Sequence, residues 1–538
     1  MKRRTFIAGL GSTAAWPLAA AAQQPDRMRR ICVLMPHDEN DPEGDASLRA
    51  AQLKKPDLAR TGGMSVDKMA FELPAETRLR RNALTANQIV AATLANIAPA
   101  MSFFFGFSVI VKGAGVAAVL TILVAMIAIL FLTNTIAQFS RFTPSTGSFV
   151  TFIGKAFGLS AGAAASVFIN LGYIIGVSTV IAIAGAWTAQ TLKLFLQVSI
   201  GWTSIAILTS FATGWLVTRG IGLSTLWAGI FFYLEAGLLL VGAILMMATH
   251  ANSLTLAPFQ YSNITGGLIG LGAAFPFAVY LFIGWENSAS LAEEAEKPRR
   301  SVPRALITST VAIGLFYVFV AYATTIGFAI DAQALSASPI PFVDALSASA
   351  PALLIVAYVA GITSIVSCLI SAVNSQARIL FNSGREGLLP EFFGKVHPQH
   401  RTPYIAIWAF LAVAASLVLG FGLVNGVAPL DYFDFAGTLF TIFIILTYML
   451  TNAALPVYVI RYHRNELDLV RHLLLPIMGI AVMLLPLWGL VQPGQPWPLN
   501  VFPWIALGVL CLCAVYGVAA TRLSAGKANF IGAYVADQ

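Results

Sequence analysis

One interrupted apolar stretch carries the side chains whose type and position suggest a binding function. The run from Ala273 to Ala305 is apolar enough in its first half to cross a bilayer, and it is interrupted by Gly284, Trp285, Glu286 and Asn287. A carboxylate deep in an apolar span is costly and usually functional. Broken helices supply binding sites in secondary transporters, because their freed backbone groups can hold a solute. The alternative is an ordinary kinked helix whose Glu286 pairs structurally with a neighbour.

A second interruption lies near the start of the apolar part of the chain. The segment Asn96 to Ser102 reads NIAPAMS and places Pro99 inside an apolar run. Proline removes a backbone donor and clashes with the preceding turn, so the helix must open or kink there. This segment is therefore a second candidate for backbone groups that are free to bind a solute.

Acidic residues are sparse in the apolar part of the chain. None occurs between Glu76 and Glu235, and only Glu235 and Glu286 lie well inside apolar runs. Each of these two carboxyl groups should be protonated or partnered in such surroundings. Asp431 and Asp434 stand at the entrance of a later apolar run and are expected to be interfacial.

The composition indicates a polytopic helical membrane protein. Of the 538 residues, 58% are hydrophobic and 10% are charged, against roughly 25% charged in soluble domains. Apolar runs of about 20 residues recur, which is the length of a membrane-spanning helix, whereas a transmembrane barrel would show short alternating segments. The net charge of +8 does not suggest nucleic acid, because the basic residues lie in short loops. No Cys/His cluster has metal-ligand spacing, so neither a metal nor a cofactor is expected.

The first residues differ in character from the rest. Residues 1–24 resemble a twin-arginine export signal, and residues up to about 44 resemble the start of a periplasmic solute-binding protein. No soluble binding domain follows, which argues against a solute-binding receptor as the second functional class. We expect residues 1–63 to be a signal-like prefix and linker, fused or mis-started, with Met64 as the natural start. The alternative is a real export signal.

Twelve membrane spans are predicted, followed by a cytoplasmic tail at 522–538 and preceded by a cytoplasmic segment at 64–85. The first five, within 86–248, are Ala86–Val111, Ala114–Ser140, Leu159–Leu192, Gly201–Thr218 and Ile221–Ala248. The next five, within 266–460, are Gly266–Leu291, Ala305–Ile330, Pro351–Ser375, Pro403–Val424 and Phe433–Ile460. The last two, within 473–521, are Leu473–Val491 and Val501–Thr521.

The distribution of basic residues predicts that both termini are cytoplasmic. With that orientation the outside loops carry only Lys112 and Lys193. The inside loops carry Arg141, Lys155, Arg219, Lys297, Arg299, Arg300, Arg304, Arg378, Arg385, Lys395, Arg401, Arg461, Arg464, Arg471, Arg522 and Lys527. Basic residues favour the cytoplasmic side of a bacterial inner membrane, so this bias supports the twelve-span map.

The two interruptions lie five spans apart. Pro99 is in the first predicted span and Gly284 is in the sixth. Because an odd offset inverts the second unit relative to the first, this spacing predicts two five-span units in an inverted repeat with paired broken helices.

Three further motifs are specific in combination. They are FIGWENSASLAEEAEKPRRSVPRA around the sixth span, SAVNSQARILFNSGREGLLPEFFGKVHPQHRTP from Ser371 to Pro403, and RFTPSTGSFVTFIGKAFG from Arg141 to Gly158. Together they resemble the amino acid–polyamine–organocation permeases, specifically bacterial amino acid permeases. The resemblance covers about Arg80 to Arg522.

This resemblance implies a fold like that of the sodium-coupled leucine transporter, with two inverted five-helix repeats and two further helices. The solute would lie between the broken first and sixth helices. Its carboxylate would meet backbone amides at the break in the first helix, since a half-helix amino terminus favours an anion. Its ammonium would meet backbone carbonyls at the break in the sixth helix. The implied substrate-binding residues are Ile97, Ala98, Ala100, Met101, Ser102, Phe282, Ile283, Gly284 and, as a wall, Trp285.

Two departures from the family pattern affect this expectation. Many members have a glycine-serine-rich first break, whereas this chain has Ala98-Pro99-Ala100-Met101. Some proton-coupled members place a lysine in the fifth span, and that neighbourhood here holds Glu235. Glu235 and Glu286 are therefore the predicted coupling and gating residues.

The predicted function is secondary active transport of an amino acid or related amine by proton symport or solute exchange, with no chemical reaction. A sodium-coupled transporter of the same fold is the alternative. A channel would show a polar stripe along several spans, and this sequence shows isolated polar breaks. The expected partners are a small-molecule solute, a coupling proton and the lipid bilayer, not nucleic acid.

Overall fold

Helices make up nearly all of residues 78–523, the part of the chain that the computed structural model describes. The prefix 1–63, most of the segment 64–85 and most of the tail 522–538 lie outside these residues. By length and composition, 10 apolar helical segments could cross a membrane. The first, Ala86–Phe142, supplies two crossings because the chain turns at Gly115, and the shorter helix Trp202–Thr218 supplies one more. The described chain thus contains the twelve predicted crossings.

The first repeat contains five crossings, of which the first is broken. They are α3 (Ala86–Ile97) with α4 (Pro99–Ala114), α5 (Ala118–Phe142), α7 (Leu159–Leu196), α8 (Trp202–Thr218) and α9 (Ile221–Thr249). The second repeat is α10 (Gly267–Tyr280) with η7 (Trp285–Glu294), α11 (Pro298–Gly327), α14 (Leu354–Arg385), α15 (Tyr404–Leu419) and α16 (Pro429–Tyr462). The last crossings are α17 (Leu475–Val491) and α18 (Phe502–Leu523).

Short helices connect the crossings. The longer connectors are α6 (Phe149–Phe157), α12 (Ala332–Ala337) and α13 (Pro341–Ser349). The single-turn connectors are η3 (Gly115–Ala117), η4 (Ala251–Ser253), η5 (Ala257–Phe259), η6 (Tyr261–Asn263), η8 (Pro351–Leu353), η9 (Glu391–Gly394), η10 (Gly420–Val424), η11 (Arg464–Glu466), η12 (Val470–Leu474) and η13 (Leu499–Val501).

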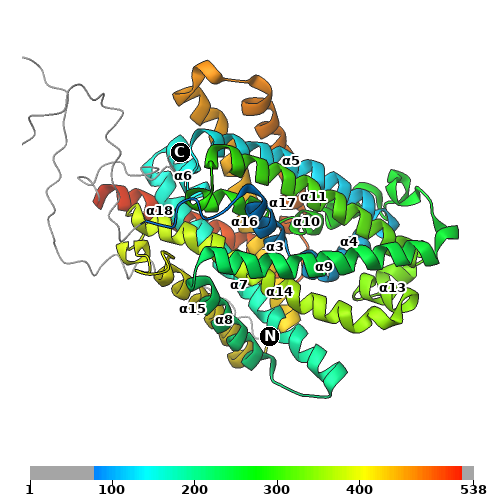
Figure 1. The fold of residues 1–538 in the computed structure, drawn as a ribbon. Coiled ribbons are helices and arrows are strands. Elements are labelled where there is room, and N and C mark those ends of the chain that lie inside the picture. Colours follow the sequence, from blue (N-terminus) through cyan, green and yellow to red (C-terminus); the bar gives the residue numbers. More distant parts are fainter. Residues whose placement is uncertain (1–77, 524–538) are drawn as a thin grey trace, which may run out of the picture.

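Helix packing follows the inverted repeat. The helix α9 packs on α14, and their counterparts five crossings away, α16 and α7, also pack on each other. The counterparts α5 and α11 form a pair, and so do α4 and α10, which belong to the two broken crossings. Figure 1 shows α4, α5, α10 and α11 gathered on one side of the bundle. The two breaks are therefore brought to the middle of the molecule.

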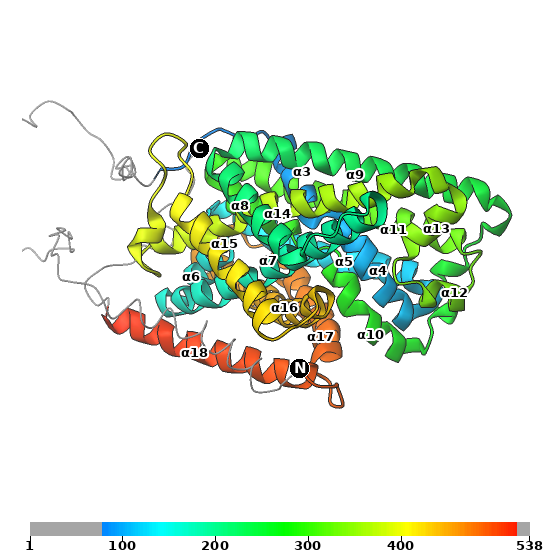
Figure 2. The same ribbon diagram turned by 90° about the horizontal axis from the view of Figure 1, so that it is seen from below.

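The helices differ strongly in burial. The most apolar stretch of α7 is almost wholly buried, at 94%, whereas the corresponding stretch of α18 is buried at only 22%. Figure 2 shows α18 running along the edge of the bundle. Large apolar side chains face outward on the peripheral helices, for example Phe211, Leu226 and Val515. A bundle with this exterior suits contact with lipid tails rather than water.

Three helices extend beyond the boundaries predicted for their membrane spans. The third crossing continues to Leu196, and its 38 residues span about 57 Å at 1.5 Å per residue, more than the hydrocarbon core. The eighth continues past Ser375 to Arg385, because Arg378 is buried in an ion pair instead of lying in a loop. The seventh begins at Pro298, since proline is tolerated in the first turn of a helix.

Candidate functional site

The first crossing breaks at a single residue. Ala98 adopts a left-handed conformation with φ of 52°, so α3 ends before it and α4 begins at Pro99. Proline disfavours helical geometry in the residue before it and lacks an N–H, which fits the first position of a new helix. The predicted site residues Ile97 and Ala98 are buried in this turn, and Ala100 is buried in the first turn of α4.

Side chains from two other helices satisfy the free amides of α4. The N–H of Ala100 donates to Glu235 Oε2 at 3.0 Å, and the N–H of Met101 donates to Ser364 Oγ at 3.0 Å. Ser367 Oγ donates to the other oxygen of Glu235 at 3.1 Å. A carboxylate is favoured at a helix amino terminus. The amides that the sequence predicts for a solute carboxylate are thus occupied by groups of the chain itself.

The carbonyls at the end of α3 also have partners. Cys368 Sγ, from α14, contacts the carbonyl oxygen of Asn96 at 3.2 Å, and the carbonyl of Ala95 accepts the N–H of Ala98 at 3.2 Å. Ser102 Oγ donates to the carbonyl of Ile97 at 2.6 Å. Sequence reasoning missed the α14 residues. Their signal was a pair of serines three residues apart, Ser364 and Ser367, which share one helix face inside an apolar span.

The sixth crossing breaks at Gly284. Its φ of 110° lies where side chains are strained, which explains the need for glycine. Two of the predicted carbonyls accept local bonds, that of Phe282 from the N–H of Trp285 at 3.1 Å and that of Gly284 from the N–H of Asn287 at 3.2 Å. The helix resumes as the tighter helix η7, so the break replaces the regular ladder over Leu281–Gly284 with turns.

Glu286 is buried and bonded to three parts of the structure. Its Oε2 accepts the N–H of Gly284 at 3.0 Å and the hydroxyl of Tyr448, from α16, at 3.0 Å. Its Oε1 accepts the hydroxyl of Tyr173, from α7, at 2.9 Å. The ring of Trp285 is buried and lies 5.8 Å from that of Tyr448. Glu286 therefore connects the break in the sixth crossing to α7 and α16.

The two breaks touch each other. A Cβ atom at Gly284 would lie 2.3 Å from Nδ2 of Asn96, so only glycine allows this approach. One turn away, the hydroxyls of Thr93 and Ser288 lie 2.6 Å apart. Within residues 78–523, Asn96 Oδ1 and both amide atoms of Asn287 are buried without a hydrogen-bond partner. Buried polar groups usually have partners, so these mark a place where a polar solute could bind.

On one side of the breaks the bundle is closed by backbone pairing. The N–H groups of Ala83 and Leu84 donate to the carbonyl of Glu294 at 2.8 and 2.9 Å, and that of Glu296 donates to the carbonyl of Leu84 at 2.9 Å. Leu84 and Ala295 form an isolated parallel bridge. The segment before α3 is thus joined to the segment after η7, and we call this the closed face.

Two ion pairs reinforce the closed face. Arg378 holds Glu294 in a two-pronged contact, with Nη2 to Oε1 at 3.0 Å and Nε to Oε2 at 2.5 Å, and both side chains are buried. Arg385 contacts Glu293, with Nη1 to Oε2 at 2.9 Å. Both arginines belong to the end of α14, the part that the sequence placed in a loop.

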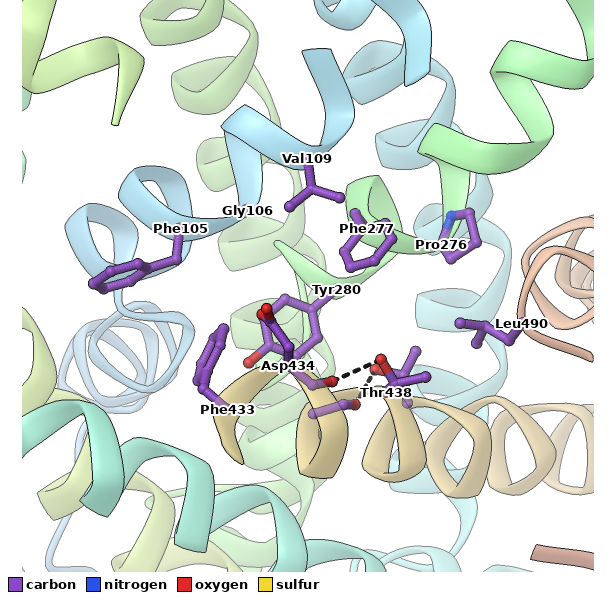
Figure 3. A pocket seen from close by; sticks show the side chains of 12 residues that line it. Phe105, Gly106, Val109, Pro276, Phe277, Tyr280, Phe433, Asp434, Thr438 and Leu490 are labelled. Atoms are coloured by element: carbon purple, nitrogen blue, oxygen red, sulfur yellow. Dashed lines mark hydrogen bonds between the residues drawn. The ribbon is translucent and has the colours of Figure 1, made fainter. Parts of the chain in front are cut away.

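Away from the closed face, between α4, α10, α16 and α17, lies a pocket that we call the α16 pocket (Figure 3). Its lining residues are Phe105, Gly106, Val109, Pro276, Phe277, Tyr280, Phe433, Asp434, Gly437, Thr438, Thr441 and Leu490. Asp434 is exposed, in keeping with its expected interfacial position, and it also lines this pocket.

Comparison with known proteins places this architecture in a family. The family model described as amino acid permease matches residues 88–491. The chain belongs to the amino acid permease family. The permease is 26% identical over 347 residues to the branched-chain amino acid permease BcaP of Bacillus subtilis (strain 168), covering 59% of this chain and 69% of that protein.

Two further relatives carry different names. The permease is 24% identical over 428 residues to the methylthioribose transporter of Bacillus subtilis (strain 168), covering 75% of this chain and 86% of that protein. It is 26% identical over 420 residues to the low-affinity putrescine importer PlaP of Escherichia coli (strain K12), covering 73% and 84%. These names include solutes with and without a carboxylate, so membership in the family does not fix the solute.

Proposed function

We propose that this permease is a secondary active transporter that moves an amino acid or a related amine across the bacterial inner membrane. The observation that carries the proposal is the contact between the two breaks, where Gly284 approaches Asn96 beside the unpartnered amide of Asn287. Transporters with broken helices bind their solutes at such midplane breaks. The relatives named as transporters of amino acids and of putrescine support the same solute classes.

The solute site in this proposal lies between α3/α4 and α10/η7. The solute ammonium binds the carbonyl side of the sixth break, around Phe282 to Gly284, and the solute carboxylate binds the amino terminus of α4. The amides of Ala100 and Met101 must be released by Glu235 and Ser364 for the carboxylate to reach them. Trp285, which is fully buried beside the break, forms a wall of the side-chain pocket.

Competition for one amide supplies a route to proton coupling. Glu235 and a solute carboxylate both suit the N–H of Ala100, and two carboxylates this close repel each other. Protonation of Glu235 removes its charge and weakens its hold on the helix amino terminus. Proton uptake and solute binding therefore favour each other, which is the requirement for symport.

Glu286 is the gating residue in this mechanism. Its bonds to Tyr173 and Tyr448 tie η7 to α7 and α16. Movement of η7 away from these helices must break or rearrange those bonds. With the termini in the cytoplasm, the closed face is cytoplasmic and the α16 pocket faces outward, so the described state is closed toward the cytoplasm.

A sodium-coupled cycle is the second candidate, because oxygen atoms gather around Glu235. The hydroxyl of Ser367 and the carbonyl of Ala95 both lie in this cluster, together with Ser364. Hard cations take oxygen ligands of this kind. The two candidates share the fold and the solute site and differ only in the driving ion.

The experiment that tests the proposal is uptake by the purified full chain in proteoliposomes. A panel of radiolabelled amino acids and amines is presented with no gradient, with a pH gradient, with a sodium gradient, or with unlabelled solute inside. Accumulation driven by the pH gradient supports symport, and uptake that needs internal solute supports exchange. Accumulation driven by sodium alone favours the second candidate. Absence of uptake for every solute under all four conditions overturns the proposal.

A further inference from the structure

The α16 pocket combines one carboxylate with an aromatic wall. Asp434 is the only charged residue among its lining side chains. Within residues 78–523, no basic side chain lies within ion-pair distance of Asp434, although Lys112 at the end of α4 acts on it through space. Asp431 is the nearest acidic neighbour on the same helix and lies outside the lining. The carboxylate of Asp434 is exposed and has no ion-pair partner among the described residues.

The aromatic rings stand around this carboxylate. The centroid of Phe433 lies 5.9 Å from that of Phe105 and 6.1 Å, edge to face, from that of Tyr280. Figure 3 shows Asp434, Tyr280 and Phe433 together at the centre of the pocket, with Phe277 close by. Aromatic faces attract ammonium groups and apolar rings accept the attached alkyl chain. An anion would meet the charge of Asp434 and would be repelled.

The pocket adjoins the solute site. Tyr280 is the last residue of α10, and the sixth break begins at the next residue, Leu281. Phe105 and Gly106 lie on α4, about two turns after the first break at Ala98. The pocket therefore lies next to the break in the sixth crossing and about two turns of α4 from the break in the first.

We propose that the α16 pocket is an ammonium-binding subsite, in which Asp434 and its aromatic neighbours hold the amine of an incoming solute before it reaches the breaks. The place of the subsite on a transport path rests on the proposed function, whereas binding of ammonium in the pocket does not. The class of ligand is an organic ammonium ion with a short apolar chain. Zwitterions and diamines both present such a group.

A thiol placed in the pocket can report its charge preference. Gly437 is buried, but a Cβ atom there would meet nothing within 4 Å, so Gly437→Cys directs a thiol into open space. The variant is made in the full chain, and Cys32→Ser and Cys511→Ser remove two other thiols that the reagents would modify. Cys368 and Cys513 are buried and can be kept. The measurement is the rate of modification by 2-(trimethylammonium)ethyl methanethiosulfonate divided by the rate with the negatively charged 2-sulfonatoethyl reagent.

Two matched variants separate the effect of the carboxylate in the pocket from that of a carboxylate outside it. Asp434→Asn should lower the rate ratio about threefold to tenfold, the range for a partly exposed charge interaction. Asp431→Asn removes the same charge about one turn away, outside the lining of the pocket, and should change the ratio clearly less than Asp434→Asn does, because Coulomb interaction falls with distance from the thiol. An equal effect of both substitutions, or no effect of Asp434→Asn, overturns the subsite.

Protection by an ammonium ligand completes the test. 1,4-Diaminobutane should slow modification at residue 437 when Asp434 is present and not in Asp434→Asn, whereas neutral 1,4-butanediol should give no protection. Protection that persists in Asp434→Asn, or that butanediol equals, places the ligand elsewhere and overturns the subsite. The labelling needs no transport, so failure of the uptake assay and failure of the subsite are distinguished. A negative labelling result leaves the transport proposal standing.

Discussion

Replacing Gly284 with alanine should separate the two breaks and weaken solute binding. The new Cβ would lie 2.3 Å from Asn96 Nδ2 and 3.2 Å from the Asn96 backbone carbon. The first contact involves the end of a side chain, which can turn away. The second involves backbone, so α3 and the sixth break must move apart by a few tenths of an ångström. In addition, alanine is strained at a φ of 110°.

The expected magnitude follows from these two effects. A non-glycine residue in a sparsely populated backbone region costs roughly 1–3 kcal/mol, and overpacking a buried contact costs roughly 1–3 kcal/mol. Because Asn96 can partly yield, we expect the low end of the combined range of roughly 2–6 kcal/mol, about 2–3 kcal/mol. If the strain is relieved by separating the breaks, solute affinity falls about 30- to 150-fold, at about 1.4 kcal/mol per factor of ten.

The assay is equilibrium binding and uptake of the solute that the panel identifies, with the melting temperature of the purified protein measured alongside. Two glycines provide matched controls. Gly387 has a positive φ of 72° with nothing near its Cβ position, so Gly387→Ala carries backbone strain without a clash. Gly237 has open space and an ordinary backbone, so Gly237→Ala carries neither. Both controls should keep wild-type affinity.

The reasoning is refuted if folded Gly284→Ala binds the solute within about threefold of wild type, since that difference is under 1 kcal/mol. A loss of affinity of the same size in Gly387→Ala would assign the effect to global strain instead of the break. The larger substitution Gly284→Leu should abolish binding while the protein still inserts into the membrane.

Four further outcomes are expected. Glu235→Gln should leave solute exchange largely intact and weaken accumulation driven by a pH gradient; accumulation equal to wild type would leave Glu235 as packing. Glu286→Gln should impair both activities in the same assay, because it loosens the tie to α7 and α16, and normal exchange would argue against gating. Arg378→Met should cost about 3–5 kcal/mol of stability by leaving Glu294 buried and unpaired, measured by thermal unfolding; an unchanged melting temperature would contradict this. Deleting residues 1–63 should leave transport intact, and failure of that truncation to insert would assign the prefix to the working protein.

The crossings and the two breaks were predictable because the bilayer restricts which sequences can cross it. A span needs about 20 apolar residues, and a proline or glycine in such a run has few structural alternatives to a break. Pro99 and Gly284 therefore located both breaks, and the structure shows chain interruptions at Ala98 and at Leu281–Gly284. The assignment of solute contacts to residues around these breaks stays a prediction.

The partners of the predicted residues could not be read from the sequence. Ser364 and Ser367 belong to the site only because α14 packs against α9 and α3. This packing brings them to Glu235 and to the break in the first crossing. Arg378 was assigned to a loop because a charge normally ends an apolar span, whereas burial against Glu294 allows the helix to continue. Asp434 is exposed, in keeping with its expected interfacial position, but its pocket is built by four separate helices and could not be predicted from the sequence.

The closed face has a consequence for genetic screens. The contact between Ala83, Leu84 and the segment Glu294–Glu296 is made by main-chain N–H and C=O groups, which every residue except proline supplies in full. An alanine scan leaves these hydrogen bonds in place and reports only side-chain packing and the ion pairs of Glu293 and Glu294. Sequence covariation is equally blind to them, because no pair of side chains encodes the pairing. A screen for the main-chain pairing of the closed face must use proline at Ala83 or Glu296, where the substitution removes an N–H donor.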